Sequence, residues 1–333
     1  MTVPAERGGA ARVPLTGQRV PDFFIVGHAK SGTTALYRML RRHPQLHMPV
    51  KEPWFFAEEL QPPTPPRAPG TGRTPKTFEE YVSLFDAAAP DQLIGEASCL
   101  YLWSRTAAGR IAQVQPGARI VAVLREPASY LRSLHMQFVQ VHLEPEKDLR
   151  KAISLEQARR EGRSVPPNQY WPQATLYSEH VRYVEQLRRY HALFAREQVL
   201  VLIYEDFRRD NEATVRTVQR FLGVDDTAPV VVTDANPTVS VRSPRVNAVV
   251  HALAAGDGPL PRAVQTLARK LAPRRLSRES AVAIRDRFLY GRPQPPDEAL
   301  MVELRRRFKP EVQALSEYLD RDLVGFWGYD DVD

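Results

Sequence analysis

The chain has 333 residues, a formal net charge of +7 and 43% hydrophobic residues. A chain of this length can bury one substantial core, and no internal repeat divides it, so we expect one α/β domain with insertions. No apolar run reaches the roughly 18 residues that a membrane-spanning helix needs. The charge comes largely from arginine clusters without zinc-finger spacing, an RNP-like aromatic run or a basic zipper, so nucleic-acid binding is not favoured.

The first twenty residues contain several prolines and glycines and lack the apolar stretch of a signal peptide. Residues 1–20 are therefore predicted to form a flexible tail. Cys99 is the single cysteine, so it cannot form an internal disulfide, which favours a reducing compartment. We expect a cytoplasmic protein, and the sequence does not indicate its oligomeric state.

A phosphate-binding loop is predicted where the apolar run Phe23–Val26 is followed by the segment 27–34, Gly-His-Ala-Lys-Ser-Gly-Thr-Thr, and then by an amphipathic pattern. Two glycines let backbone amides converge, and the following helix adds its positive dipole end. An ordinary nucleoside-triphosphate loop has its lysine directly after the second glycine, where Thr33 stands here. Lys30 instead precedes Gly32, which brings its ammonium nearer to a single 5′-phosphate and to the group that this phosphate carries.

Strand and helix patterns then alternate along the chain, which predicts a parallel sheet with ligands at its carboxyl edge. Strands are expected at residues 93–96, 119–124 and 199–204. Helices are expected after the loop as far as Pro44, from Pro127 onward, from Asp210 or Asn211 to Gly223, and over 177–194 and 300–319. The Pro- and Gly-rich stretch 61–76 is expected to be an irregular excursion, either a surface loop or one lip of an acceptor cleft.

Arg125 ends the strand 119–124, and Ser133 lies about two turns into the helix that follows. An arginine fork and a serine hydroxyl facing one edge of a nucleotide suit a ribose 3′-phosphate. The alternative is a structural arginine and a serine on an exposed helix face. Nearer the N-terminus, Lys51 and Glu52 precede an aromatic run, where Glu52 serves either as a general base or as half of a surface ion pair.

These motifs resemble those of sulfotransferases that use 3′-phosphoadenosine 5′-phosphosulfate, and the likeness runs from about Pro21 to Gly223. The segment K-S-G-T-T resembles their 5′-phosphosulfate loop, and the pair Arg125 and Ser133 resembles their 3′-phosphate motif. The segment K-E-P-x-F-F at 51–56 resembles the heparan-sulfate branch. The resemblance implies a P-loop-like three-layer α/β/α domain with a central parallel sheet.

The resemblance also implies roles for individual residues. The donor would be held by Lys30, Ser31, Gly32, Thr33, Thr34, Arg125, Ser133 and, in a basic C-terminal loop, Arg242. Lys30 would also neutralise charge on the bridging oxygen, and Glu52 would be the base, with His135 as the alternative. No metal is expected, because a sulfuryl group carries less charge than a phosphoryl group.

One segment departs from the heparan-sulfate branch: Gly95-Glu96-Ala97-Ser98 has alanine where that branch has lysine. This departure puts a sulfated-polysaccharide acceptor in doubt. Glu96 and Ser98 either line the cleft or anchor the loop. The acceptor is left open as a small molecule, a lipid or a glycan, and the following aromatic residues either line its cleft or belong to the core: Trp54, Tyr101, Trp103, Tyr170 and Trp171.

The expected domain covers 21–333, with core motifs in 21–223 and an Arg-rich helical part in 224–333. Two other functions stay open. A magnesium-dependent nucleotide kinase or NTPase would use a variant loop and Glu205-Asp206 as metal ligands. A noncatalytic nucleotide-binding protein would keep the loop and Arg125 without turnover.

Overall fold

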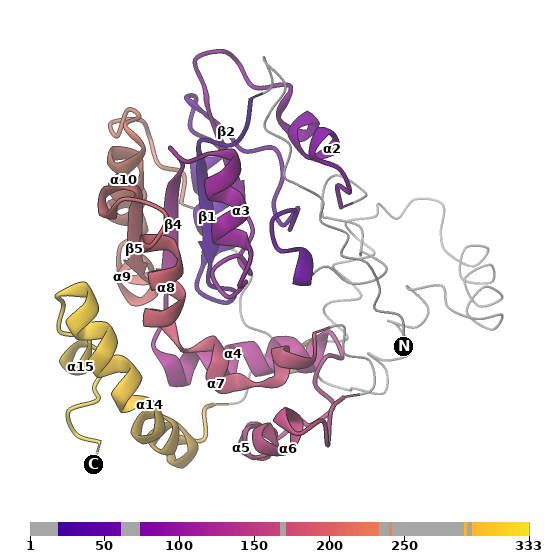
Figure 1. Cartoon of the computed structure of the whole chain (residues 1–333). Coiled ribbons are helices and arrows are strands. Elements are labelled where there is room, and N and C mark those ends of the chain that lie inside the picture. The colour runs from indigo at the N-terminus through magenta and orange to yellow at the C-terminus, as the bar shows by residue number, and fades with distance from the viewer. Residues whose placement is uncertain are drawn as a thin grey trace, which may run out of the picture. The chain divides into compact units, whose positions relative to one another are not determined.

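The computed structural model describes residues 19–60, 74–166, 171–232, 240–241, 290–291 and 295–332 (Figure 1). The chain forms two compact units. The first comprises Met1–Tyr130, Ser178–Asn236 and Arg305–Asp333, and the second comprises Leu131–Tyr177 and Pro237–Leu304. The predicted domain limits 21–333 remain a prediction, and Arg242 and Tyr170 lie outside the described residues.

The main sheet has five strands in the order β2-β3-β1-β4-β5, and all neighbouring pairs are parallel. Its strands are β1 (Phe23–Gly27), β2 (Leu46–His47), β3 (Leu93–Ala97), β4 (Arg119–Leu124) and β5 (Val199–Ile203). Helices α1 (Thr33–Leu40) and α10 (Asn211–Leu222) contact each other and pack on β1 and β5. Helices α3 (Ala107–Val114) and α8 (Tyr183–His191) pair with each other in front of the sheet in Figure 1. The predicted three-layer α/β/α fold is therefore confirmed.

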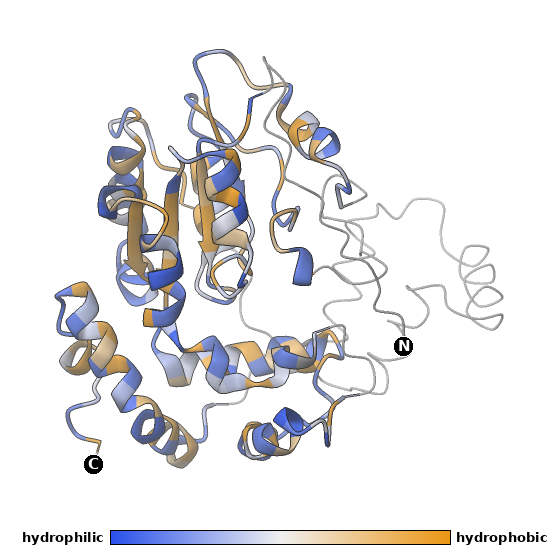
Figure 2. Cartoon of the chain, viewed as in Figure 1, coloured by the Kyte–Doolittle hydropathy of each residue, from blue (hydrophilic) through white to orange (hydrophobic). Residues whose placement is uncertain are grey.

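Burial on both faces explains why the strands are continuously apolar, as their colour in Figure 2 shows. All five residues of β1 are buried. Phe23 and Ile25 join the side chains of α1 and α10 in one core cluster, together with Val121 and Val123 of β4. Most of the helices combine apolar and polar residues, so both colours appear along them in Figure 2.

The remaining helices of the described chain are short connections and a long C-terminal element. They are α2 (Phe78–Val82), α4 (Pro127–Gln140), α5 (Leu149–Ser154), α6 (Glu156–Arg160), α7 (Tyr177–His180), α9 (Tyr204–Arg209), α14 (Glu298–Leu319) and α15 (Leu323–Phe326). Single 3-10 turns cover Glu58–Leu60, Ser83–Phe85, Pro172–Thr175 and Arg196–Gln198. Two short strands, β6 (Ser240–Val241) and β7 (Tyr290–Gly291), pair antiparallel.

Several helix ends match the sequence signals. Pro127 opens α4, and the Asp210 side chain caps α10 by accepting from the amide of Ala213 at 2.9 Å. Gly223 ends α10 with φ 69°, in the left-handed region that glycine enters without strain.

Two predicted boundaries were wrong. The helix expected over 177–194 is divided into α7 and α8, because Arg182 leaves the helical region with ψ 58°. No proline or glycine marks this break, so the sequence pattern carries no signal of it. The strand expected to reach Tyr204 ends at Ile203, and Tyr204 opens α9.

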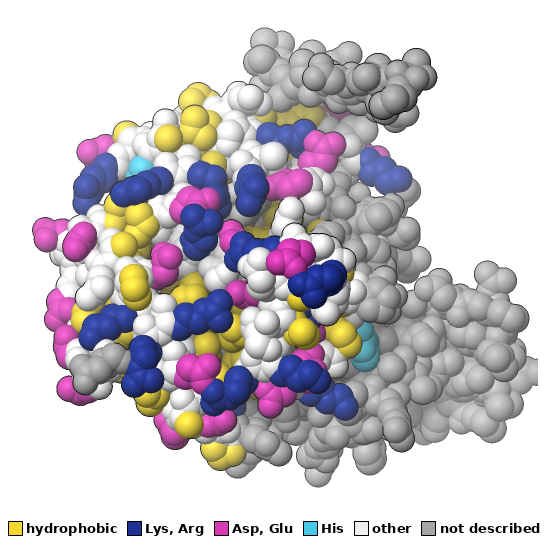
Figure 3. All heavy atoms as spheres, turned by 60° about the horizontal axis from the view of Figure 1, so that its bottom comes forward, with side chains coloured by type: hydrophobic (Ala, Val, Ile, Leu, Met, Phe, Trp, Pro, Cys, Tyr) yellow, Lys and Arg dark blue, Asp and Glu magenta, His cyan; other side chains and the backbone are white. Residues whose placement is uncertain are grey.

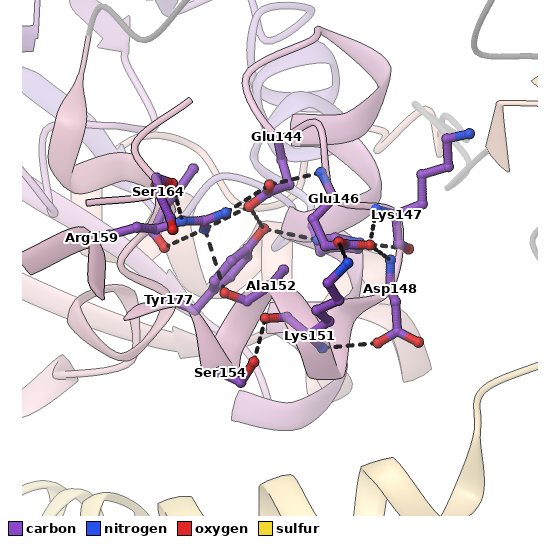
Figure 4. A network of polar contacts seen from close by, with 12 residues as sticks. Glu144, Glu146, Lys147, Asp148, Lys151, Ala152, Ser154, Arg159, Ser164 and Tyr177 are labelled. Atoms are coloured by element: carbon purple, nitrogen blue, oxygen red, sulfur yellow. Dashed lines mark hydrogen bonds and ion pairs between the residues drawn. The ribbon is translucent and has the colours of Figure 1, made fainter. Parts of the chain in front are cut away.

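A buried ion pair organises the described part of the second unit (Figure 4). Both terminal nitrogens of Arg159 donate to the Glu144 carboxylate, at 2.7 and 2.9 Å. Arg159 also donates to the backbone carbonyl of Thr175, and the Tyr177 hydroxyl lies 3.1 Å from Glu144. Removing one partner would leave an uncompensated buried charge, so this pair holds its surroundings in one arrangement.

The surface carries charges of both signs. On the face in Figure 3, Lys and Arg side chains lie among Asp and Glu side chains and do not gather into one patch. No helix among the described residues is long and apolar enough to cross a bilayer.

Candidate active site

Three neighbouring strands bring two predicted site residues, Lys30 and Arg125, to one edge of the sheet together with Cys99. The sheet order places β3, β1 and β4 side by side and parallel, so their carboxyl ends lie together. The loop with Lys30 follows β1, Cys99 follows β3, and Arg125 follows β4. All of these residues belong to the first unit.

The loop after β1 is a tight turn that opens α1. Lys30 has φ 63° and Gly32 has φ 82°, so both lie in the left-handed region. A Cβ atom at Gly32 would meet the ring of Phe207 at 3.0 Å, and any side chain would be strained at this φ, so the position favours glycine. Thr33 and Thr34 form the first turn of α1, where amides have no partner within the helix and attract an anion.

Ser31 has a buried hydroxyl without a protein partner in the described chain. Its side chain is fully buried, and its Oγ has no hydrogen-bond partner among the described residues. A buried hydroxyl without a partner is costly, and a phosphate oxygen held in the loop would supply the missing acceptor. The loop therefore fits an anion such as a phosphate group.

His28, in the same loop, is a buried and uncharged residue whose ring nitrogens contact two other side chains. Its Nε2 lies 2.5 Å from Oε1 of Gln186, and its Nδ1 lies 3.3 Å from the Tyr130 hydroxyl. Burial lowers the pKa of His28 to about 3, against a weaker opposing effect of the Gln186 hydrogen bond. Nε2 therefore carries the proton and donates to Gln186, and Nδ1 accepts from Tyr130.

The side chain of Arg125 forms a hydrogen bond with the backbone of Lys30. Nη1 of Arg125 donates to the carbonyl of Lys30 at 3.0 Å. Burial and then the charge of Arg125 lower the pKa of Lys30, and the neighbouring Cys99 opposes them. Two cations lie close together at this half-buried site. A bound anion would be stabilised there, because it would offset their mutual repulsion and their lost hydration.

The Arg125 side chain is held on two further sides. Its Nε donates to Oγ of Ser129 at 3.0 Å, and its guanidinium lies 4.7 Å from the centre of the Tyr204 ring. Within the described chain, these contacts leave Nη2 for an outside ligand. The predicted partner Ser133 is buried on α4, in the second unit, and its role at the nucleotide remains a prediction.

Glu52 lies in the segment that runs beside the end of β3. Its amide donates to the carbonyl of Ala97 at 2.8 Å, and its φ is 62°. Its Oε2 accepts from the indole of Trp54 at 2.7 Å and from the amide of Cys99 at 3.1 Å, while Oε1 pairs with the ammonium of Lys51. These donors fix the carboxylate in one orientation at the same edge as the loop.

Lys51 takes part in this arrangement as a buried partner. Burial lowers its pKa, but the adjacent Glu52 carboxylate and smaller contributions outweigh burial, so the pKa is raised overall. Lys51 therefore stays charged and forms an ion pair with the Glu52 carboxylate. The pair is largely buried, with side-chain exposures of 15% and 14%, so it is not the surface ion pair that the sequence left open.

Glu96 anchors the structure beneath this segment. It is fully buried, and its Oε2 accepts from the hydroxyls of Tyr81 at 2.8 Å and Tyr101 at 3.1 Å. Burial raises the pKa of Glu96 to about 7, although hydrogen bonds from Ser98, Tyr81 and Tyr101 lower it. Ser98 is also fully buried and accepts from the amide of Trp54 at 3.2 Å. Of the two predicted roles, anchoring is the one that these contacts support.

His135, the alternative base, belongs to the second unit, where both ring nitrogens have protein partners. Nε2 contacts the carbonyl of Lys147 at 3.0 Å and Nδ1 contacts the Tyr177 hydroxyl at 2.8 Å. Burial lowers its pKa, opposed by the Lys147 carbonyl and nearby carboxylates. These contacts leave neither nitrogen for an acceptor proton.

The sequence reasoning missed Ser129, Tyr204 and Cys99. Ser129 lies in the first turn of α4, two residues after Pro127, so the predicted start of this helix beside Arg125 carried a signal for it. Tyr204 and the Cys99 amide reach the site through tertiary packing that no local pattern shows. Of the aromatic acceptor candidates, Tyr101 is fully buried and Trp103 stacks on His180, with ring centres 4.5 Å apart.

A metal site in the described ranges would be formed by His, Cys, Asp and Glu side chains. These ranges contain no group of three or more such side chains suited to a metal ion. The two carboxylates suggested for magnesium already have protein partners: Glu205 accepts from the Trp327 indole, and Asp206 pairs with Arg209 and Arg321.

The fold and the loop define an α/β protein with a loop suited to an anion at one sheet edge, and comparison with known proteins gives its family. A profile of the sulfotransferase family matches residues 21–228. The chain therefore belongs to the sulfotransferase family. It is also similar to a solved structure, a sulfotransferase from Alicyclobacillus acidocaldarius, with 26% identity and a TM-score of 0.64 over 92% of this chain and 98% of that one.

Curated relatives match shorter parts. Membrane-associated sulfotransferase kil1 of Dictyostelium discoideum is 34% identical over 34% of this chain and 23% of its own length. Bifunctional heparan sulfate N-deacetylase/N-sulfotransferase 4 of Mus musculus is 28% identical over 63% of this chain and 23% of its own length. Carbohydrate sulfotransferase 15 of Mus musculus is 25% identical over 62% of this chain and 44% of its own length. The matched region thus spans less than half of each of these relatives.

Proposed function

We propose that this sulfotransferase uses 3′-phosphoadenosine 5′-phosphosulfate as donor and transfers its sulfuryl group to a hydroxyl or amine. The observation that carries the proposal is the position of Lys30 inside the turn, with its carbonyl bonded to Arg125. A lysine placed there meets the 5′-phosphate and its leaving bond, and an arginine one strand away meets a second phosphate. A donor with phosphates at both the 5′ and 3′ positions fits this spacing of charges.

In the proposed reaction, a bond forms between the acceptor oxygen or nitrogen and sulfur while the bond between sulfur and the 5′-phosphate oxygen breaks. The amides of the 27–34 loop, with Ser31, Gly32, Thr33 and Thr34, hold the 5′-phosphate. Lys30 stabilises the negative charge that develops on the departing oxygen. Glu52 accepts the acceptor's proton, and adenosine 3′,5′-bisphosphate leaves.

Glu52 is the proposed base because of its placement. It lies at the same sheet edge as Lys30, and the amide of Cys99 and the indole of Trp54 aim its carboxylate. His135 has both nitrogens occupied in the second unit, so it is the weaker candidate. Ser133 and Arg242 remain proposed contacts of the 3′-phosphate.

The acceptor class is proposed from the relatives. Two of them are named for heparan sulfate or carbohydrate, so a glycan is the first acceptor to test. Ala97 lacks the lysine of the heparan-sulfate branch, so small-molecule alcohols and lipids belong in the same screen. We also propose a cytoplasmic location, because the single cysteine, Cys99, cannot form an internal disulfide and so suits a reducing compartment.

The test is a sulfuryl-transfer assay with labelled donor and a panel of alcohols, amines and glycans, with and without a chelator. We expect transfer that a chelator does not reduce. If no acceptor is sulfated but the bisphosphate binds tightly, the result would favour the alternative hypothesis of a noncatalytic nucleotide-binding protein. Loss of transfer with the chelator would show that a metal takes part.

A further inference from the structure

The C-terminal segment after α14 returns to the residues that hold Arg125. Trp327 and Tyr329 are both buried, and all of their contacts described below lie within the first unit. The indole of Trp327 donates to Oε2 of Glu205 at 3.0 Å, and the hydroxyl of Tyr329 donates to Oε1 of Glu126 at 2.6 Å. We call Trp327, Tyr329, Glu205 and Glu126 the C-terminal latch.

Each carboxylate of the latch also accepts hydrogen bonds from backbone amides next to Arg125. Oε1 of Glu205 accepts from the amide of Glu126 at 3.3 Å. The Glu126 carboxylate caps α4, accepting from the amides of Ala128 at 3.0 Å and Ser129 at 2.7 Å. The carbonyl of Arg125 itself accepts from the Tyr183 hydroxyl at 2.9 Å. The peptide that carries Arg125 is thus held on both sides.

The side-chain partners of Arg125 depend on the same carboxylates. Ser129, which accepts from Nε of Arg125, has its amide bonded to Glu126. Tyr204, whose ring lies under the guanidinium, directly precedes Glu205 at the start of α9. Moving either carboxylate would therefore move a surface on which the guanidinium rests.

We infer that the C-terminal latch positions Arg125 for the 3′-phosphate of the nucleotide, and that Trp327 and Tyr329 are therefore positioning residues for donor binding. The inference rests on the proposed function, because it assigns the 3′-phosphate to Arg125. A hydrogen bond to a buried carboxylate is among the stronger ones. Without the Tyr329 hydroxyl, the Glu126 carboxylate keeps the amides of Ala128 and Ser129 and lies 3.7 Å from Nε of Arg305, so we expect it to shift toward these remaining partners. Arg125 also donates to the Lys30 carbonyl, so we expect its displacement to weaken ligands with a 3′-phosphate most and ligands with a 5′-phosphate alone much less.

The test compares affinities for adenosine 3′,5′-bisphosphate and adenosine 5′-monophosphate in Tyr329→Phe and Trp327→Phe by calorimetric titration. We expect binding of the bisphosphate to weaken about tenfold and binding of the monophosphate to change by less than about threefold. A general loss of structure would weaken both ligands alike, so the ratio of the two affinities isolates positioning.

Tyr318→Phe is the matched control. Tyr318 is on α14, and its hydroxyl contacts Nδ1 of His191 at 2.6 Å, away from the latch residues. We expect this variant to keep the wild-type ratio. In an Arg125→Ala background, Tyr329→Phe should have no further effect on the bisphosphate, since the residue that it positions is gone.

The two proposals fail in different ways. A wild-type protein that prefers the bisphosphate, with Tyr329→Phe and Trp327→Phe behaving like Tyr318→Phe, would overturn the latch alone. A wild-type protein that binds the monophosphate as tightly as the bisphosphate would overturn the 3′-phosphate site and the latch with it. An equal effect of Tyr329→Phe with and without Arg125 would also contradict the latch.

Discussion

The two sides of the proposed site are built in different ways. On the donor side, residues 27–34 are contiguous, and their glycines and helix start create the binding surface locally. On the acceptor side, Glu52 is oriented by the Ala97 carbonyl and the Cys99 amide, which lie more than forty residues farther along the chain. A short motif can therefore specify donor binding, whereas the geometry of the base depends on how the sheet and its connections pack.

Both sides nevertheless place a charged residue at a left-handed φ, 63° for Lys30 and 62° for Glu52. Such a conformation costs a non-glycine residue about 1–3 kcal/mol and persists only where the surroundings enforce it. On the donor side the turn enforces it, and on the acceptor side the hydrogen bonds of Glu52 enforce it. The following predictions test this difference, beginning with the largest expected effect.

Lys30→Ala should lower turnover about a thousandfold or more, because the charge that stabilises the departing oxygen is lost. Binding of adenosine 3′,5′-bisphosphate should weaken much less, since the loop amides and Arg125 remain. Single-turnover kinetics and calorimetric titration measure the two effects separately. Lys147→Ala, at an exposed lysine of the second unit, is the control, and turnover within about threefold of wild type in Lys30→Ala would remove the lysine from the reaction.

Glu96 should make the acceptor side sensitive to pH. An unfolded glutamate loses its proton near pH 4.5, whereas buried Glu96 keeps its proton up to a pKa of about 7. Between these values the folded state binds more protons, so the free energy of unfolding should fall as pH rises, by about 3 kcal/mol in total. Denaturant titrations from pH 4 to pH 8 measure this slope.

Glu96→Gln should flatten that slope, because its amide has no proton to lose in this range. Glu58→Gln changes an exposed carboxylate and should keep the slope of the wild type. If Glu96→Gln and wild type followed the same pH profile, the ionisation of Glu96 would not be the cause.

Glu52→Gln should lower turnover about a hundredfold and leave donor affinity intact, because the amide cannot accept the acceptor's proton. The measurement is the rate of transfer to an alcohol acceptor beside the dissociation constant of the bisphosphate. Glu58→Gln again serves as the control. Unchanged transfer would exclude Glu52 as the base and reopen the case for His135.

Arg125→Ala should weaken binding of the bisphosphate about thirtyfold while binding of the 5′-monophosphate changes by less than about threefold. Arg110→Ala removes an exposed arginine that pairs with Glu58 and should change neither. Equal weakening of both nucleotides would assign Arg125 to the loop structure, through its bond to the Lys30 carbonyl, and not to the 3′-phosphate.

The sequence predicted most of the sheet, because strands covered on both faces leave a continuous apolar signature. It missed β2, which has two residues, too few for any periodicity. It also missed the break between α7 and α8 at Arg182, where tertiary packing sets the backbone without proline or glycine. Helix ends with a side-chain cap or a left-handed glycine, at Asp210 and Gly223, were predictable because their cause is local.

The same contrast between local sequence and tertiary packing applies to the candidate site. The loop around Lys30 was predictable because the residues that form it are consecutive in the sequence. Arg125 was predictable from its place at a strand end, but its contacts with Ser129 and Tyr204 and the latch behind it depend on the fold. The orientation of Glu52 by Trp54 and Cys99 likewise follows from packing.

The central claim is that this sheet edge binds a nucleotide with both a 5′- and a 3′-phosphate. Calorimetric titration of the purified protein with adenosine 3′,5′-bisphosphate, adenosine 5′-monophosphate and Mg-ATP tests it most directly. We predict metal-independent binding of the bisphosphate, about a hundredfold tighter than that of the monophosphate. Preference for Mg-ATP would contradict the account and make Lys30 the lysine of a variant triphosphate loop.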